Sequence, residues 1–417
     1  MKRFSVVFMF IFIMGIGLAG CGGGSENADN DGDGKVKTIS FIHWRGEDKD
    51  AFNKIIQKFE EENPDIKVNM DAFPSDQYET TVQTKLKNGA SGDVFAMMPG
   101  VQFNTLTNAG LASELDEEIV SRFIPEYITV GESDGKQYGL PLQLVFNIPV
   151  YNKSMFDEYG LEPPKDWEGF LELNEALKEK GVEYPIVFPA GDNGPGQFMN
   201  PMMMNTEPEE GIWEKVQDGE RKITEDWWIE TLTKIKELND NGYFGKDTLG
   251  ITQDESGTIF AQEKAGMLAM GSYMMEQVHK QNPEMEMGLI APITSSEEDT
   301  VWEGIHTTTF MVAVNEHSKY KEEAEKFIEF LTRPENASIY ANETGQLLTL
   351  QDVKYESEVL QAQVPWTEKE TRFQPRYTIT NGQVSDAVLS SIDSVLTGVE
   401  PEKAAEQAQK LIEQSIK

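Results

Sequence analysis

The fold is decided by residues 38–98, which read TISFIHWRGEDKDAFNKIIQKFEEENPDIKVNMDAFPSDQYETTVQTKLKNGASGDVFAMM. Short apolar runs rich in β-branched and aromatic residues alternate here with segments whose apolar residues recur at helical spacing. The first helical segment stops at Asn63-Pro64, because proline cannot continue a helix. The expected elements are strands at 38–44, 66–70 and 93–98 and helices at 50–62 and 78–86.

The order strand, helix, strand, helix, strand predicts parallel pairing with right-handed crossovers, and therefore an open α/β lobe. The second half of the chain also combines strand-like and helix-like segments. Further expected elements are a helix from Trp228 to Leu238 ended by Asn241-Gly242, a strand at 310–314, a helix from Ala324 to Leu331 stopped by Pro334, and two C-terminal helices, one through Val388 and Val395 and one from Pro401.

The length and net charge of the chain limit the classes of protein to which it can belong. A chain of 417 residues exceeds the ~250–300 residues at which a single core stops growing, so two lobes are expected. The 36 basic and 72 acidic residues give a net charge of −36, which repels nucleic acid and anionic lipid, so neither is expected as a partner. The same charge keeps a secreted protein soluble.

The N-terminus has the order of a secretory signal. Lys2 and Arg3 precede the uncharged apolar run Phe4–Gly20, which ends in small residues before the only cysteine, Cys21. Leu18-Ala19-Gly20-Cys21 resembles the lipobox of bacterial lipoproteins, in which Cys21 would become the mature N-terminus and carry lipid on its sulfur. An uncleaved transmembrane anchor is the alternative, because the run is near the lower limit for a spanning helix. Both interpretations export the chain and keep it on a membrane.

A polar segment follows this signal. Residues 22–37 are Gly, Ser, Asn and Asp with almost no apolar content, which is typical of a flexible linker. Residues 1–20 are therefore expected to be a signal peptide and 21–37 a lipid-anchored linker. Asp29-x-Asp31-x-Asp33-Gly34 copies the first half of a calcium loop, but Ser40 stands where the bidentate Glu is required, so no metal site is expected.

Sequence signatures of catalysis are missing. The chain has no Gly-x-Ser-x-Gly elbow, no His-Glu-x-x-His pair among its four histidines, and no glycine-rich phosphate loop with its Lys. No cofactor is expected. A pair of carboxylates for glycoside cleavage stays open, because 72 acidic residues make a pair easy to find by chance.

The positive signal is a series of short segments in a fixed order. The segments are Trp44-Arg45, Glu60 to Val68, Gly92 to Ala96, Asp134 to Pro141, Val150 to Lys153, Pro163 to Trp167, Phe260 to Met267, Gly271 to Tyr273, Thr344 to Leu347, and Gly398 with Pro401.

In this order the segments resemble the extracellular solute-binding proteins of ABC importers, specifically the carbohydrate branch that includes the maltodextrin-binding proteins. The resemblance covers about the whole mature chain. Three segments depart from the family's usual pattern. Glu263 to Met267 replaces Gly-Lys-Ala-Ala-Met, Tyr273 replaces Trp, and Leu348 replaces Pro. The change at Tyr273 leaves the fold unaffected, but no particular sugar is carried over.

The resemblance implies an α/β protein of two open parallel-sheet lobes joined by a three-crossing hinge, the class II arrangement of periplasmic-binding-protein-like folds. The crossings are expected near Leu140–Asn147, Val301–Thr309 and Gln346–Lys354. Lobe 1 would comprise 38–143 plus 304–347, and lobe 2 would comprise 144–303 plus 348–417. A ligand that touches both lobes then stabilises the closed form by its differential affinity for it.

The resemblance also suggests the ligand contacts. Sugars present an apolar face and a rim of hydroxyls, so they require flat aromatic surface and polar groups that can fork. The expected contacts are Trp44, Arg45, Tyr78, Met97, Gln143, Asn147, Tyr273, Trp302, His306, Thr307 and Trp366. Each aromatic residue has core packing as its alternative, and Arg45 has ion pairing with Asp48 or Glu47. Core packing is the expectation for Trp167, Trp213, Trp227, Trp228 and the methionines of 199–204.

The resulting hypothesis is a monomeric, extracytoplasmic receptor, held by the lipid on Cys21, that captures a sugar or oligosaccharide and delivers it to the permease of an ABC transporter without covalent chemistry. One alternative is a secreted carbohydrate-active hydrolase that uses two of the acidic residues. Another keeps the fold but binds a polyamine or other small solute, drawn by the negative charge.

Overall fold

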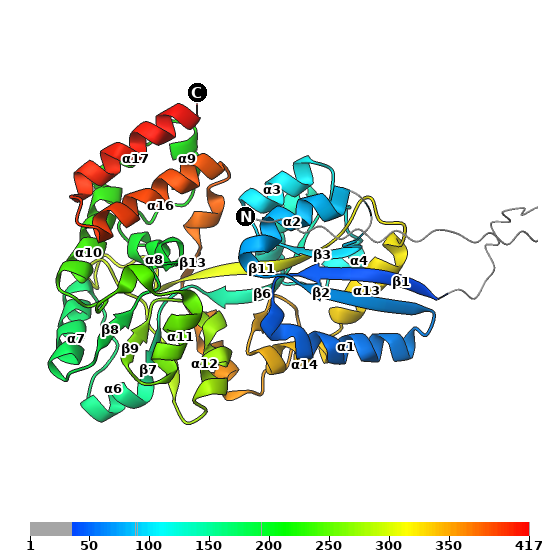
Figure 1. Cartoon of the computed structure of the whole chain (residues 1–417), viewed down its shortest axis with the longest axis horizontal. Coiled ribbons are helices and arrows are strands. Elements are labelled where there is room, and N and C mark those ends of the chain that lie inside the picture. The colour runs from blue at the N-terminus through cyan, green and yellow to red at the C-terminus, as the bar shows by residue number, and fades with distance from the viewer. Residues whose placement is uncertain (1–35, 88, 90, 193, 417) are drawn as a thin grey trace, which may run out of the picture. The chain divides into compact units, whose positions relative to one another are not determined.

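Two β-sheets organise the part of the chain described by this computed structural model, which is residues 36–416 without 88, 90 and 193 (Figure 1). The larger sheet has the order β12-β6-β11-β3-β1-β2, with β13 beside β11; the smaller has the order β10-β7-β9-β8. We call the larger sheet with its helices the first lobe and the smaller sheet with its helices the second lobe. The strands of the larger sheet are β1 Lys37–His43, β2 Ile66–Ala72, β3 Val94–Met97, β6 Leu140–Phe146, β11 Gly304–Val314, β12 Leu347–Leu348 and β13 Thr371–Phe373. The others are β7 Val150–Asn152, β8 Tyr184–Val187, β9 Ala265–Leu268 and β10 Met287–Leu289, with the hairpin β4 Glu132–Ser133 and β5 Lys136–Gln137.

Helices cover both sheets. Those of the first lobe are α1 Lys49–Glu62, α2 Ser75–Lys87, α3 Val101–Asn108, α4 Glu117–Val120, α5 Pro125–Ile128, α13 Lys321–Leu331 and α14 Pro334–Thr344. Those of the second lobe are α6 Lys153–Tyr159, α7 Trp167–Glu179, α8 Gly194–Met203, α9 Ile212–Gln217, α10 Asp226–Asp240, α11 Gln253–Ala261, α12 Met275–Gln281, α16 Gly382–Leu396 and α17 Pro401–Ser415; α15, Glu358–Gln361, lies between β12 and β13 in sequence.

The N-terminal part of the fold forms as the sequence predicts. β1 pairs in parallel with both β2 and β3, and α1 and α2 are the two crossovers. The rest of the larger sheet is mixed, because β11 runs antiparallel to β3 and to β6. The smaller sheet is mixed as well, since only β8 and β9 are parallel. Strands that return from the other lobe do not have to follow the right-handed βαβ rule that imposes parallel pairing.

The larger sheet is packed on both faces. On one face Phe41 of β1 packs against Phe52 of α1 and Phe327 of α13, and Phe59 of α1 also packs against Phe327. On the other face the apolar side of α2 covers Phe95 and its neighbours on β3. Figure 1 shows α1 and α2 on opposite sides of these strands.

Three tryptophans form the centre of the second lobe's helical layer. Trp213, Trp227 and Trp228 are at most 5% exposed, and Trp213 stands edge-on to each of the other two rings at 5.3 Å. Met199, Met202, Met203 and Met204 are fully buried beside them or at the join to the first lobe. The prediction of core packing is confirmed for all of these residues. Trp167 is half-buried, and its indole N–H donates to Glu237 at 3.1 Å.

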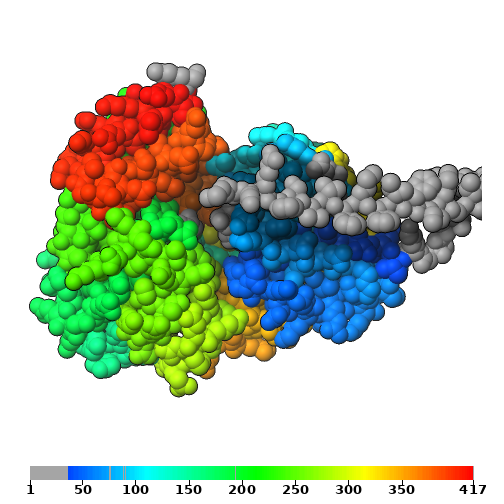
Figure 2. Space-filling model, in the orientation of Figure 1, coloured from blue at the N-terminus to red at the C-terminus, as the bar shows by residue number. Residues whose placement is uncertain are grey.

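β6 and β11 join the lobes, and a third connection follows β12 (Figure 1). The prediction that this third crossing lies within 346–354, with lobe 2 resuming at residue 348, is wrong. Thr349 and Gln351 pair through their backbones with Ile124 and Arg122, and Leu350 forms a bridge with Phe123, so this stretch remains on the first lobe. The chain reaches the second lobe only in β13 and the turn after it, where the Arg372 guanidinium donates to the carbonyls of Glu207 and Glu209. Figure 2 shows the first lobe, blue and cyan, and the second lobe, green and red, as two adjoining masses.

The N-terminal expectations fall largely outside the described residues. The signal peptide of residues 1–20, the lipid site Cys21 and the linker up to residue 35 all lie there. β1 begins at Lys37, which pairs with Ile66, so the strand starts one residue before its expected first residue. Within the described part of the chain, no helix is both long enough and apolar enough to cross a membrane.

Candidate functional site

β11 runs between the two lobes, and its residues alternate between two faces of the larger sheet. Its register aligns Thr307 with Val145 of β6, and His306 with Phe146 of β6 and with Phe373 of β13. We call the side of the sheet that carries Thr307 the Thr307 face and the opposite side the His306 face. His306 and Thr307, which the sequence predicts as partners in one site, are therefore separated. A strand sends successive side chains to opposite sides, so they cannot share a site.

The Thr307 face has a cluster of buried polar atoms without partners. The Asn147 amide nitrogen, the Thr307 hydroxyl and the Gln374 amide oxygen have no hydrogen-bond partner among the described residues, although these residues are at most 4% exposed. Asn147 follows β6 and its N–H bonds to the Ile305 carbonyl, and Gln374 follows β13 and its N–H bonds to the His306 carbonyl. The three residues therefore extend from three neighbouring chain segments on one face. An unpaired buried polar group costs about 1–3 kcal/mol, which indicates a partner that the chain itself does not supply.

The second lobe places further polar groups on this cluster. The Gln374 amide nitrogen donates to the Gln197 side chain of α8 at 3.0 Å, and the Arg376 N–H donates to Asn200 of the same helix. The Arg376 guanidinium lies over Gly196, where a Cβ would stand 2.3 Å from its Nη1. A larger residue at this position would therefore displace the guanidinium from where it lies.

Tyr273, from the turn after β9, approaches the same region from the second lobe. Burial raises the pKa of its hydroxyl, Tyr377 and Asp192 raise it further, and the positive charges of Arg376 and Arg45 oppose them. Since such effects require proximity, Tyr273 lies between groups of the second lobe and Arg45 of the first. Its backbone carbonyl lies 3.5 Å from the side-chain nitrogen of Gln346. Tyr273 is thus near both lobes, and its contact with a ligand stays a prediction.

Arg45 is held by an internal network. Its guanidinium binds both carboxylate oxygens of Asp48, and Glu47 lies 3.3 Å away. The Tyr340 hydroxyl donates to Asp48 at 2.6 Å and accepts from the Gln143 amide at 2.7 Å. Burial opposes the charge of Arg45, but Asp48 and Glu47 outweigh it, so its pKa is raised. The alternative of ion pairing describes Arg45 correctly, and Gln143 belongs to the same network.

Trp44, Tyr78 and Met97 differ in how much of each side chain a ligand could reach. The Trp44 ring is half-buried and packs against Tyr78 and Phe310 at 5.3 and 5.0 Å, so part of its surface stays available. Tyr78 is 2% exposed, and its hydroxyl is hydrogen-bonded to the carbonyls of Ala96 and Ile42. Met97 is fully buried beneath Gly139. The prediction of ligand contact is wrong for Tyr78 and Met97, because the helix α2 closes over this end of the sheet.

Trp302 and Trp366 also lie away from the Thr307 cluster. The Trp302 indole donates to the Pro208 carbonyl at 3.0 Å, and its backbone N–H donates to the Asn205 side chain. Trp366 packs over Gly304 and lies 6.1 Å from Phe146, which belongs to the His306 face. Both rings are only partly buried, and their role as ligand contacts stays a prediction.

Four residues of this region were not predicted from the sequence: Gln197, Gln374, Arg376 and Tyr377. The stretch Phe373-Gln374-Pro375-Arg376-Tyr377 offered a signal, because it interleaves aromatic, amide and guanidinium groups around a proline in a non-helical segment. Such a mixture suits a ligand with both an apolar face and hydroxyls. Its position beside β11, however, follows from a parallel pairing between distant segments, which no local pattern predicts.

Comparison with known proteins decides the family. The sequence profile of the bacterial extracellular solute-binding proteins matches residues 45–338, which is more than half of the chain. The chain belongs to this family. Its members are receptors for solutes and not enzymes, so the hydrolase alternative is set aside.

Individual relatives of this solute-binding protein are distant but extensive. The chain is 25% identical over 334 residues to the multiple sugar-binding protein of Streptococcus mutans, covering 76% of each chain. It is 24% identical over 321 residues to the melibiose/raffinose/stachyose-binding protein MelE of Bacillus subtilis, covering 74% of this chain and 72% of MelE. A sugar transporter of Bacillus licheniformis in complex with stachyose superposes with a TM-score of 0.73 at 20% identity, covering 89% of this chain and 98% of the other. This last likeness confirms the two-lobed α/β fold.

Proposed function

We propose that this protein binds a neutral sugar or oligosaccharide on the Thr307 face, in a cleft between the two lobes, and delivers it to the permease of an ABC transporter. The unpaired atoms of Asn147, Thr307 and Gln374 carry the proposal. They are uncharged and include donors and acceptors, as sugar hydroxyls require. Trp44 and Tyr273 would supply flat surface for the apolar face of a sugar ring. The names of the relatives, which specify sugars, support the same class of ligand.

Binding would be coupled to movement at β6 and β11. A ligand that contacts Asn147 and Thr307 on the joining strands and Tyr273 on the second lobe would favour the closed arrangement by its differential affinity. The permease would then distinguish the loaded receptor from the empty one. One ligand per monomer is expected.

A titration with galactosyl oligosaccharides tests the proposal. Melibiose, raffinose and stachyose would each be added to the mature protein in a calorimeter. At 100 times its dissociation constant, a ligand raises the free energy of unfolding by about 2.7 kcal/mol, so thermal shifts should accompany the heats. Added salt should change the sugar affinity little, because salt weakens interactions between charges and the ligand carries none. No heat and no thermal shift across a broad set of neutral glycans would contradict the proposal.

A matched pair of variants locates the site. Thr307→Val removes a hydroxyl and keeps the side-chain shape, so it should weaken sugar binding about tenfold, the effect of one lost hydrogen bond of about 1.4 kcal/mol. Thr308→Val makes the same change on the opposite face of β11 and should leave sugar affinity unchanged. If the two substitutions change the sugar affinity equally, the Thr307 face is not the binding site.

We further propose that lipid on Cys21 holds the receptor at the outer surface of the cell membrane. The lipobox-like order of residues 18–21 supports this proposal. Expression in a bacterial host supplied with a labelled fatty acid should give a labelled, membrane-associated protein, and Cys21→Ser should release an unlabelled one. Label retained by the Cys21→Ser variant would place the lipid elsewhere.

A further inference from the structure

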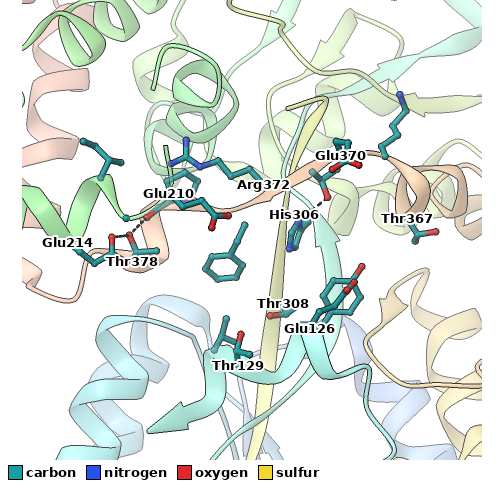
Figure 3. A pocket seen from close by; sticks show the side chains of 18 residues that line it. Glu126, Thr129, Glu210, Glu214, His306, Thr308, Thr367, Glu370, Arg372 and Thr378 are labelled. Atoms are coloured by element: carbon teal, nitrogen blue, oxygen red, sulfur yellow. Dashed lines mark hydrogen bonds between the residues drawn. The ribbon is translucent and has the colours of Figure 1, made fainter. Parts of the chain in front are cut away.

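The His306 face carries a cavity that the proposed sugar site does not use. It has a volume of about 600 Å³, and β11 contributes His306 and Thr308 to its lining (Figure 3). Residues 126–130 of the first lobe line one side, and residues 210–214 of the second lobe line another. Segment 367–378, which includes β13, completes the lining. The cavity therefore lies on the opposite face of β11 from Thr307 and is lined by both lobes.

The cavity contains an unpaired polar atom. Thr308 is 1% exposed, and its hydroxyl has no hydrogen-bond partner among the described residues. Register places Thr308 opposite Leu144, on the same face as His306. A buried hydroxyl that lines a cavity of this size, and that no side chain satisfies, indicates a partner inside the cavity.

Carboxylates dominate the charged groups of the lining, which include Glu126, Glu210, Glu214 and Glu370. The positive groups are engaged. Lys369 binds Glu303 at 2.7 Å, and the Arg372 guanidinium donates to two backbone carbonyls. Burial lowers the pKa of Arg372, and the nearby Glu210 and Glu214 partly oppose this effect. Glu126 and Glu370 have no basic partner among the described residues. Figure 3 shows Glu126, Glu210 and Glu370 around the opening, with His306 and Thr308 between them.

Aromatic rings flank the same space. His306 stands edge-on to Tyr127 at 5.8 Å and to Phe373 at 6.0 Å, and its Nδ1 is bonded to the Thr371 hydroxyl at 2.9 Å. Rings beside carboxylates that have no basic partner among the described residues are the surroundings that suit an organic cation, because the ring faces attract an ammonium group and also cover its alkyl chain.

We propose that this cavity binds a small organic cation with primary ammonium groups, such as an aliphatic diamine. Its ammonium groups would be neutralised by Glu126 and Glu370, the Thr308 hydroxyl would accept a hydrogen bond from one of them, and the alkyl chain would lie against Tyr127 and Phe373. The site is separate from the sugar site, so it extends the proposed function and does not depend on it.

Calorimetric titration with 1,4-diaminobutane tests this proposal, with 1,4-butanediol as the neutral molecule of similar length. We expect saturable binding of one diamine per chain, and no binding of the diol. Glu126→Gln, Glu370→Gln and Thr308→Val should each raise the diamine dissociation constant, by about tenfold for a charge-assisted contact. The same variants should bind sugar as the wild type does, so failure of the sugar site would not affect the result.

The control addresses the net charge of −36, which attracts any cation weakly. Glu298 is exposed and lies outside the lining, so Glu298→Gln changes the charge by the same amount without touching the cavity. Its diamine affinity should equal that of the wild type. The proposal is overturned if the wild type shows no saturable diamine binding, if the diol binds equally well, or if Glu298→Gln weakens binding as much as Glu126→Gln.

Discussion

At the scale of single residues, the buried polar groups divide into those that the chain satisfies and those that it leaves open. Asp48 is 2% exposed and is satisfied by Arg45 and Tyr340, so this group is structural. Asn147, Thr307 and Gln374 are equally buried but have open hydrogen-bonding positions. Because an unsatisfied group lowers stability, the second set is the better guide to a ligand.

Removing the Asp48 carboxylate should destabilise the protein strongly. Asp48→Ala leaves the Arg45 guanidinium buried without its main counter-charge, which costs about 3–5 kcal/mol in the free energy of unfolding. Glu47→Ala removes the exposed partner of the same arginine and should cost no more than about 1 kcal/mol. Chemical denaturation of both variants checks this, and equal losses would show that the two carboxylates are equivalent.

His43 should make stability depend on pH. Burial lowers the pKa of His43 to about 4, with Asp48 opposing the shift and Arg45 adding to it. The unfolded chain, with an ordinary histidine pKa near 6.5, binds the proton more readily. Stability is therefore complete above about pH 6.5 and falls by about 1.4 kcal/mol for each pH unit from there towards pH 4.

The variant His43→Phe removes this titration while keeping a ring among Phe41, Phe52 and Phe310. It loses the acceptor for the Arg45 N–H, so it should be less stable at neutral pH. Its stability should nevertheless fall less steeply than that of the wild type between pH 6.5 and 4. Denaturant midpoints measured across this range give the answer, and parallel curves for the two proteins would contradict the assignment.

At the scale of elements, local sequence signals account well for helix limits. α7 begins after Asp166, whose carboxylate accepts from the Gly169 N–H at 2.8 Å, and α17 begins at Pro401 after Glu400, whose side chain makes no such bond. α10 ends at Asn241-Gly242, and Gly242 adopts a φ of 73°, as the sequence predicts for a helix stop.

A comparison of the two N-caps gives a direct test. Asp166→Ala should lower the free energy of unfolding by about 1 kcal/mol, the usual contribution of a capping side chain. Glu400→Ala makes the same truncation at a helix start without a capping bond and should change it by less than about 0.5 kcal/mol. Denaturant unfolding compares them, and the assignment fails if Glu400→Ala is the more damaging.

The sequence predicts which strands pair less well than it predicts where helices begin and end. Periodicity identified β1, β2 and β3 and placed α1 and α2 between them, because each element has its own repeat. The same approach missed β13, since three residues are too few to show a period, and its partner Gly304–His306 is more than 60 residues away. Gln374 and Arg376 depend on that pairing for their positions, so they could not be assigned to the site.

At the scale of the whole molecule, the two lobes meet through the backbone at Gly100. Gly100 precedes α3 of the first lobe with a φ of 78°, and a Cβ there would stand 2.6 Å from the Tyr377 carbonyl in the turn after β13. The Tyr377 hydroxyl also lies 4.0 Å from the Met98 sulfur. This arrangement of the lobes therefore requires glycine at position 100.

Gly100→Ala should weaken sugar binding at least tenfold, because the added methyl group keeps Tyr377 and the first lobe apart. Gly110→Ala provides the control, since Gly110 also has a positive φ, 65°, but has nothing within 4 Å of its Cβ position. Both substitutions should cost about 1 kcal/mol of stability through backbone strain. Calorimetry measures the sugar affinity of both variants, and equal affinities would mean that binding does not need this contact.

The position of β11 has a consequence for how the protein is made. The central strand of the first sheet is encoded some two hundred residues after β3, its neighbour in space. While the chain is being synthesised from its N-terminus, the early strands have no partner on that edge, and loop closure over such a distance is slow. A nascent chain of this design stays incompletely folded until most of it has emerged, which suits a polypeptide that has to be threaded through a translocation pore before it takes its final form.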